Sequence, residues 1–98
     1  MAKSVISNEK ECYICRCLYG VENKRNLECH HLYPGSANRK KSEADGMKVW
    51  LCHEHHQGNE SVHFDPVLSS WLKKRGQKKY EETHTREEFI ERYGRSYL

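Results

Sequence analysis

The stretch that decides the fold runs from Cys29 to His63 and reads CHHLYPGSANRKKSEADGMKVWLCHEHHQGNESVH. Six of the seven histidines of the chain lie in it. Upstream, Cys12 and Cys15 form a Cys-x2-Cys pair, and Cys52 begins a Cys-x2-His pair inside the stretch. Thiolate and imidazole groups are the ligands that zinc prefers in proteins. The stretch therefore predicts that bound metal shapes this chain.

The two pairs are spaced for one structural zinc ion. Zinc favours four ligands in a tetrahedron, and a Cys-x2-Cys turn followed by a pair on one helical turn can supply them. The predicted ligands are Cys12, Cys15, Cys52 and His55. Two alternatives stay open, because Cys17 could replace Cys15 and His56 could replace His55. The competing interpretation is that the cysteines are small buried hydrophobic residues.

Length and composition explain why a metal would be needed. A chain of 98 residues makes one small domain with a thin core, and only 36 % of these residues are hydrophobic. Small domains of this kind commonly depend on metal or disulfides. We expect a single domain over 1–98, with a frayed lead-in at 1–10, a zinc-clipped core at 12–64 and a helical extension at 65–98.

The sequence also predicts the compartment. No stretch approaches the apolar run of about 20 residues that spans a bilayer, and residues 1–7 lack the apolar segment of a secretion signal. We therefore expect a cytoplasmic protein without a membrane partner. In a reducing compartment five cysteines are better interpreted as metal ligands than as disulfides.

A β-hairpin is predicted at the centre of the chain. Residues 27–33 form a short strand that Pro34-Gly35 ends, and residues 47–52 form a second, alternating strand. Between them, residues 36–46 are polar and basic without apolar periodicity, which predicts a long loop. Residues 12–17 have the form of a zinc knuckle, a tight turn. Residues 53–57 should form a short helix.

Two helices are predicted after the hairpin. Asp65-Pro66 starts the first, with Asp65 as N-cap. Its core-facing residues, at helical spacing, are Val67, Leu68, Trp71 and Leu72. Thr85 and Glu88 form a capping box that starts the second helix, and Gly94 ends it. Gly76 should weaken the middle of the first helix. The predicted fold class is thus small α+β.

Basic residues gather in two clusters that predict a phosphate-bearing partner. The first follows the predicted hairpin strand, and the second lies in the first C-terminal helix. The candidates for DNA binding are Arg39, Lys40, Lys41, Lys73, Lys74 and Lys78. Either cluster alone would be interpreted as a solvated surface. Because the two basic clusters flank the metal-ligand region, a nucleic acid is favoured as the partner.

Residues 12–64 resemble the HNH, or ββα-metal (His-Me finger), nucleases. The resemblance is carried by Glu28-Cys29-His30-His31-Leu32, by Trp50-Leu51-Cys52-His53-Glu54-His55-His56 and by the two Cys/His pairs. More narrowly, the stretch looks like small phage-type nucleases whose hairpin is clipped by a structural metal, among them the Ref-like, RecA-associated group. The resemblance implies a ββα-metal finger with a zinc-clipped hairpin and a phage-encoded enzyme that acts in the bacterial host cell.

The same resemblance implies roles for individual residues. His30 would bind a catalytic divalent ion together with His56 and His63, and His31 would be the general base. No asparagine precedes Leu51-Cys52, where the family has the residue that orients the base, so Asn38 is proposed as its substitute. Neighbours on an ideal strand face opposite sides, so both His30 and His31 can reach one site only at a bulge or strand end.

The leading hypothesis is a metal-dependent endonuclease that cuts DNA and leaves 5′-phosphate and 3′-hydroxyl ends. Its cofactors would be a structural Zn²⁺ and one catalytic divalent ion, Mg²⁺, Mn²⁺, Ni²⁺ or Zn²⁺. Targeting would come from a second copy of the chain or from a recombination or packaging protein. The main alternative is a non-catalytic zinc-binding adaptor for DNA or protein. A weaker third is a redox or metal-storage protein that uses the thiols of Cys12–Cys17.

Overall fold

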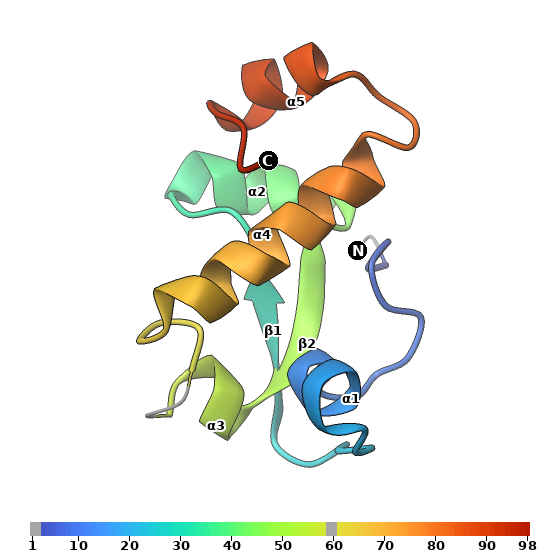
Figure 1. Cartoon of the computed structure of the whole chain (residues 1–98), viewed down its shortest axis with the longest axis vertical. Coiled ribbons are helices and arrows are strands. Elements are labelled where there is room, and N and C mark those ends of the chain that lie inside the picture. Colours follow the sequence, from blue (N-terminus) through green and yellow to red (C-terminus); the bar gives the residue numbers. More distant parts are fainter. Residues whose placement is uncertain (1–2, 59–60) are drawn as a thin grey trace.

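The computed structural model describes residues 3–58 and 61–98, which form a small α+β fold (Figure 1). Its elements in chain order are α1 (Tyr13–Tyr19), β1 (Leu27–His31), α2 (Ser36–Asp45), β2 (Lys48–Cys52), α3 (His53–His56), α4 (Pro66–Tyr80) and α5 (Arg86–Tyr93). Among the described helices, none is both long and apolar enough to cross a membrane.

The two predicted strands pair as an antiparallel hairpin. The pairing is continuous from Leu27 opposite Cys52 to His31 opposite Lys48. Alternation places His30 on the same face as its buried partner Val49, whereas His31 faces the other way with Lys48. Because β1 ends at His31, the paired histidines sit at a strand end, without a bulge.

Residues 36–46 are not the predicted loop, because they contain helix α2. Only Ser42 is buried in this helix, so no apolar stripe marks it in the sequence. Polar contacts hold it instead: Asp45 accepts hydrogen bonds from Arg92 and from Tyr93 Oη (2.6 Å) of α5. The local signal was Gly46, which ends the helix in the left-handed conformation (φ 73°) that glycine favours.

The N-terminal region differs from expectation in two ways. The predicted knuckle at residues 12–17 runs into helix α1, and Cys12 is its N-cap, accepting from Cys15 N. Residues 3–10 lie along the hairpin and are not a frayed lead-in, since Ser4 Oγ donates to Lys48 O (2.5 Å) and Val5 N donates to Gly46 O (3.0 Å). Residues 1–2 of that lead-in lie outside the described residues.

Helix α4 crosses the hairpin on its inner face (Figure 1). Its N-cap Asp65 accepts from the backbone N–H groups of Val67 and Leu68, which confirms the predicted start. Of the four residues expected to face the core, Leu72 is buried and Leu68 and Trp71 are partly buried. Val67 was predicted wrongly: it is 79 % exposed, because it lies in the first turn, beyond the end of the hairpin core.

Helix α5 closes an aromatic core over the end of β1. The capping box of Thr85 and Glu88 is present, as predicted. Phe89 and Tyr93 are buried and pack on Tyr33, with ring centroids 5.3 and 4.4 Å from it. Tyr33 follows the paired histidines closely in sequence, so this core fixes the strand end that carries them.

Gly76 is needed where α4 meets β1, although the sequence suggested only a weakness there. A Cβ atom at this position would lie 2.6 Å from Leu32 Cδ1 and 2.6 Å from Tyr33 Oη.

We expect Gly76→Ala to destabilise the protein by about 1–2 kcal/mol, since overpacking costs about 1–3 kcal/mol and alanine returns up to about 1 kcal/mol of helix propensity. Chemical unfolding measures this. Lys74→Ala, at an exposed position of the same helix, should change stability by less than about 0.5 kcal/mol; equal effects would contradict the packing argument.

Candidate metal centres and histidine cavity

Three thiols and one imidazole converge beneath the hairpin. Cys12 caps α1, Cys15 lies in its first turn, Cys52 ends β2 and His55 lies in α3. Nδ1 of His55 is 3.5, 3.4 and 3.3 Å from the sulfur atoms of Cys12, Cys15 and Cys52, respectively. In a tetrahedral zinc site, bond lengths of about 2.3 Å to sulfur and about 2.0 Å to nitrogen place a sulfur ligand about 3.5 Å from a nitrogen ligand. All four residues are buried, and the cluster could hold a structural metal such as zinc.

The geometry decides between the alternatives that the sequence left open. Cys17 is exposed on α1, so Cys15 is the second thiol of the cluster. His56 belongs to a different group of side chains, so His55 is the imidazole. Successive positions on a helix point about 100° apart, which lets neighbouring histidines of α3 serve separate groups.

The electrostatics of the thiols favour a cation between them. Burial raises the pKa of Cys15 to about 12, and burial also raises the pKa of Cys52. Thiols that stay protonated would leave three buried sulfur atoms with weak hydrogen bonds, whereas a bound cation would stabilise them as thiolates. Further hydrogen bonds reach the sulfurs from Cys15 N (3.4 Å) and Asn23 Nδ2 (3.7 Å).

A second group consists of three histidines from three segments. His30 comes from β1, His56 from α3, and His63 from the segment before α4. The ring centroids of His30 and His56 are 5.2 Å apart, those of His56 and His63 5.2 Å, and those of His30 and His63 5.9 Å. Each ring offers one nitrogen within 4.8 Å of the others, which suits one divalent ion.

The charge state of His30 fits this use. Burial lowers the pKa of His30, and together with the neighbouring His56 and His63 it brings this pKa to about 3. Its ring is therefore neutral near pH 7, with a lone pair free for a metal ion.

Glu28 orients the second histidine of this group. Its Oε1 is 2.7 Å from Nδ1 of His56, and its Oε2 is 2.9 Å from Nδ1 of His53. These hydrogen bonds lower the pKa of Glu28, so it is ionised and accepts a hydrogen bond from each ring. A proton held on Nδ1 leaves Nε2 of His56 as the nitrogen that can bind a metal, as carboxylates do for many metal-bound histidines.

His31 has a different carboxylate partner. Its Nε2 lies 3.0 Å from Oε1 of Glu43 in α2, and Lys48 pairs with the other oxygen of Glu43. Hydrogen bonds from Lys48 and His31 lower the pKa of Glu43, which keeps it a charged acceptor. Asn38, predicted to orient His31, instead donates to Tyr93 O (3.2 Å). It was misassigned because the predicted loop around it is a helix that faces α5.

One cavity joins the paired histidines to basic residues. Its volume is about 670 Å³, and His30, His31, His56 and His63 all line it. Arg39 from α2 and Lys73 from α4 also line it, so one residue of each predicted basic cluster reaches the histidines. Among the described residues, the lining of this cavity includes these two cations and no carboxylate, which suits an anionic ligand.

The other predicted DNA-binding residues lie elsewhere. Lys41 Nζ donates to Arg92 O (2.8 Å) and thereby ties α2 to α5. Lys40, Lys74 and Lys78 are exposed, and Lys78 lines a separate hollow with Tyr13 and Arg75. Of the six predicted DNA-binding residues, only Arg39 and Lys73 therefore line the histidine cavity.

Sequence reasoning missed both carboxylates. Glu28 precedes His30 by two residues, so strand alternation alone places them on one face, and this signal was readable. Glu43 had no such signal, because its position beside His31 depends on the fold of α2. The two residues explain how each histidine is held.

The chain matches no protein-family model, no curated protein and no solved structure. The side chains of the cysteine cluster and of the histidine cavity are therefore the basis for inferring its function.

Proposed function

We propose that the protein is a metal-dependent DNA endonuclease of the ββα-metal (HNH) type. The observation that carries the proposal is the gathering of His30, His56 and His63 around one point in a cavity that His31 also lines. Isolated histidines are common on protein surfaces, but three that converge, with a fourth beside them, are typical of a metal-dependent hydrolytic site.

The order of elements supports the proposal. β1 and β2, with α2 between them in the chain, pair as a hairpin, and α3 follows β2 directly and contacts both strands. His30 and His31 stand at the end of the first strand and His56 on the helix, so this ββα unit supplies most of the proposed site. The cysteine cluster holds the junction of β2 and α3 against α1, which fixes the position of His56.

The proposed reaction is hydrolysis of a phosphodiester bond. A divalent ion held by His30, His56 and His63 would supply positive charge for a phosphate oxygen and for the leaving 3′ oxygen. His31 takes a proton from the attacking water. Its Nε2–H donates to Glu43, so the lone pair of Nδ1 is the proton acceptor.

Glu43 is a positioning residue in this proposal. Its charge stabilises the imidazolium that forms when His31 accepts a proton, and its hydrogen bond fixes the ring. The Lys48 side chain, only 9 % exposed, holds Glu43 in turn. The base is thus oriented by a carboxylate on α2 rather than by Asn38.

DNA is the proposed substrate because of the cations that share the cavity. Arg39 and Lys73 line the cavity with the histidines and would bind phosphates there. Contacts to phosphate give binding that weakens with salt and carries little sequence information. We expect a second copy of the chain, or a recombination or packaging protein, to provide targeting, since one small cavity offers few groups for base recognition.

Two measurements on zinc-loaded protein test the proposal. Plasmid DNA is incubated with Mg²⁺, Mn²⁺, Ni²⁺ or added Zn²⁺, and nicked and linear products are quantified; at least one ion should produce cleavage that leaves 5′-phosphate ends. Metal titration followed by calorimetry should give a second, weaker site that His30→Ala removes. One tight zinc, no second site and no cleavage with any ion would leave the adaptor function instead.

A further inference from the structure

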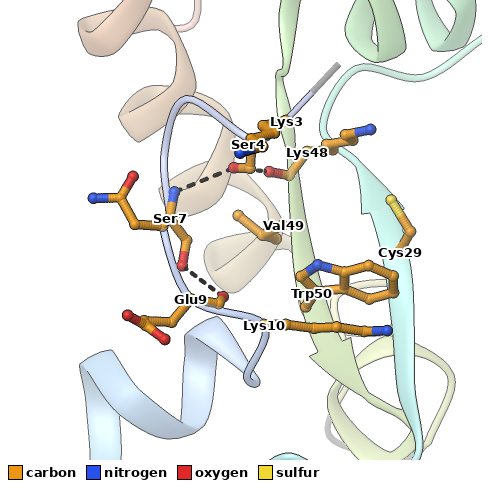
Figure 2. Close-up of a pocket in the computed structure, with 10 residues that line it drawn as sticks. Lys3, Ser4, Ser7, Glu9, Lys10, Cys29, Lys48, Val49 and Trp50 are labelled. Carbon is orange, nitrogen blue, oxygen red and sulfur yellow. Dashed lines mark hydrogen bonds between the residues drawn. The ribbon is translucent and has the colours of Figure 1, made fainter. Parts of the chain in front are cut away.

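A second cavity of about 450 Å³ lies on the outer face of the hairpin (Figure 2). Residues 3–10 form one wall and β2 the other, with the hydrogen bond from Ser4 Oγ to Lys48 O fixing the wall at one end. The residues used in the argument below are Lys3, Glu9, Lys10, Cys29, Lys48 and Trp50. None of them belongs to the proposed metal site.

The lining combines an aromatic face with ammonium groups. Trp50 is only partly buried, and Lys10 Nζ lies 4.5 Å from the centre of its ring. Lys3 stands at the other end of the cavity, and both lysines are exposed. The carboxylate of Glu9 points away from Trp50, on the far side of the segment (Figure 2). An aromatic surface flanked by cations is how proteins bind single-stranded nucleic acid.

This cavity adjoins the histidine cavity. Cys29 lines both, and it pairs with Trp50 across the hairpin. Cys29 is two residues from His31, which along a strand is about 7 Å. A single strand whose phosphate lies at the histidines would therefore bring a neighbouring nucleotide to the indole of Trp50.

Duplex DNA cannot use this surface, since its bases are already stacked on their neighbours. We infer that the Trp50 groove, formed by residues 3–10 and the outer face of β2, binds an unpaired nucleotide next to the cut, with its base on the indole and its phosphate on Lys10 or Lys3. The inference rests on the proposed nuclease function for the identity of the strand. It specifies the substrate as single-stranded or locally unpaired DNA.

Fluorescence of Trp50 tests the groove without requiring cleavage. The chain has two tryptophans, so Trp71→Phe leaves Trp50 as the single reporter. Zinc-loaded Trp71→Phe protein, with no other divalent ion added, is titrated with a short oligothymidylate and with duplex DNA of the same length. The single strand should quench Trp50 and the duplex should not. An unchanged Trp50 signal at oligonucleotide concentrations that saturate binding by anisotropy would overturn the inference.

Variants separate stacking from general attraction. Trp50→Leu should weaken binding of the labelled single strand about tenfold, within the range for loss of one base–aromatic stack, whereas Trp50→Phe should keep most of the affinity. Lys10→Ala should reduce the slope of log affinity against log salt by about one, and Lys24→Ala, an exposed lysine paired with Glu22, should not. Equal affinities of Trp50→Leu and Trp50→Phe would overturn the inference, provided that both retain zinc.

The outcome for the groove is distinguishable from the outcome for the enzyme. Cleavage of plasmid DNA with no response of Trp50 would leave the nuclease proposal intact and refute the groove. Quenching of Trp50 by the single strand, with no cleavage of either plasmid or single-stranded DNA by any ion, would support the groove and refute the nuclease proposal.

Discussion

Cys15→Ala is expected to leave the protein unfolded at room temperature. The substitution removes one of four buried groups around a common point, and a structural zinc ion contributes about 10–16 kcal/mol to the folding of small domains. The whole stability of a domain is only about 5–15 kcal/mol. Loss of this metal site therefore exceeds what the thin core can offset. Circular dichroism and the zinc content of the purified protein measure the effect.

Cys17→Ala is the matched control for this experiment. It removes the same atom from the same helix at an exposed position outside the cluster. It should retain one zinc ion per chain and the melting temperature of the wild type. A strong chelator should unfold both the wild type and Cys17→Ala. If Cys15→Ala melts like the wild type, or if chelation leaves the fold unchanged, the cluster does not hold a structural metal.

His31→Ala is expected to reduce DNA cleavage about 100- to 10,000-fold, the usual contribution of a general base. His31 is not among the three converging histidines, so binding of the second divalent ion should persist. The structural cluster is also untouched, so the variant should fold and keep its zinc. Single-turnover cleavage with saturating divalent ion measures the chemical step.

His84→Ala is the control for loss of an imidazole. His84 stacks on Tyr80, with ring centroids 4.1 Å apart, outside the residues that line the histidine cavity. Its cleavage rate should match that of the wild type. Unchanged cleavage by a folded, zinc-loaded His31→Ala would refute the role of His31 as base, whatever the fate of the metal site.

The starts of α4 and α5 were predictable from the sequence because the capping side chains and the N–H groups that they bind are close in the chain. Asp65 caps the two N–H groups that follow it, and Thr85 bonds Glu88 three residues on. Residues 48–52 were likewise predictable as a strand from their β-branched and aromatic side chains, although the structure buries residues on both faces of β2. Helix α2 escaped prediction because its stabilising partners, Arg92 and Tyr93, are 47 and 48 residues away from Asp45.

The candidate site likewise has a part that the sequence predicted and a part that depended on the fold. The spacing of Cys12, Cys15, Cys52 and His55 was enough to group them, since few arrangements of two short pairs satisfy a tetrahedral ion. Spacing could not exclude Cys17 or His56, because the choice depends on which face of α1 and α3 points inward. Nor could it replace Asn38 by Glu43, whose approach to His31 requires α2 to be a helix.

The sequence by itself determined the hairpin, the helix starts and the residue types available for metal binding, because these depend on neighbours along the chain. The family resemblance had already grouped His30, His56 and His63, and the tertiary structure brings their rings together. Only the tertiary structure decided that Glu28 and Glu43 hold separate histidines and that Trp50 faces a groove beside them. The physical reason is that these contacts depend on how distant segments pack. That packing is the sum of many weak interactions, which no short stretch of sequence specifies.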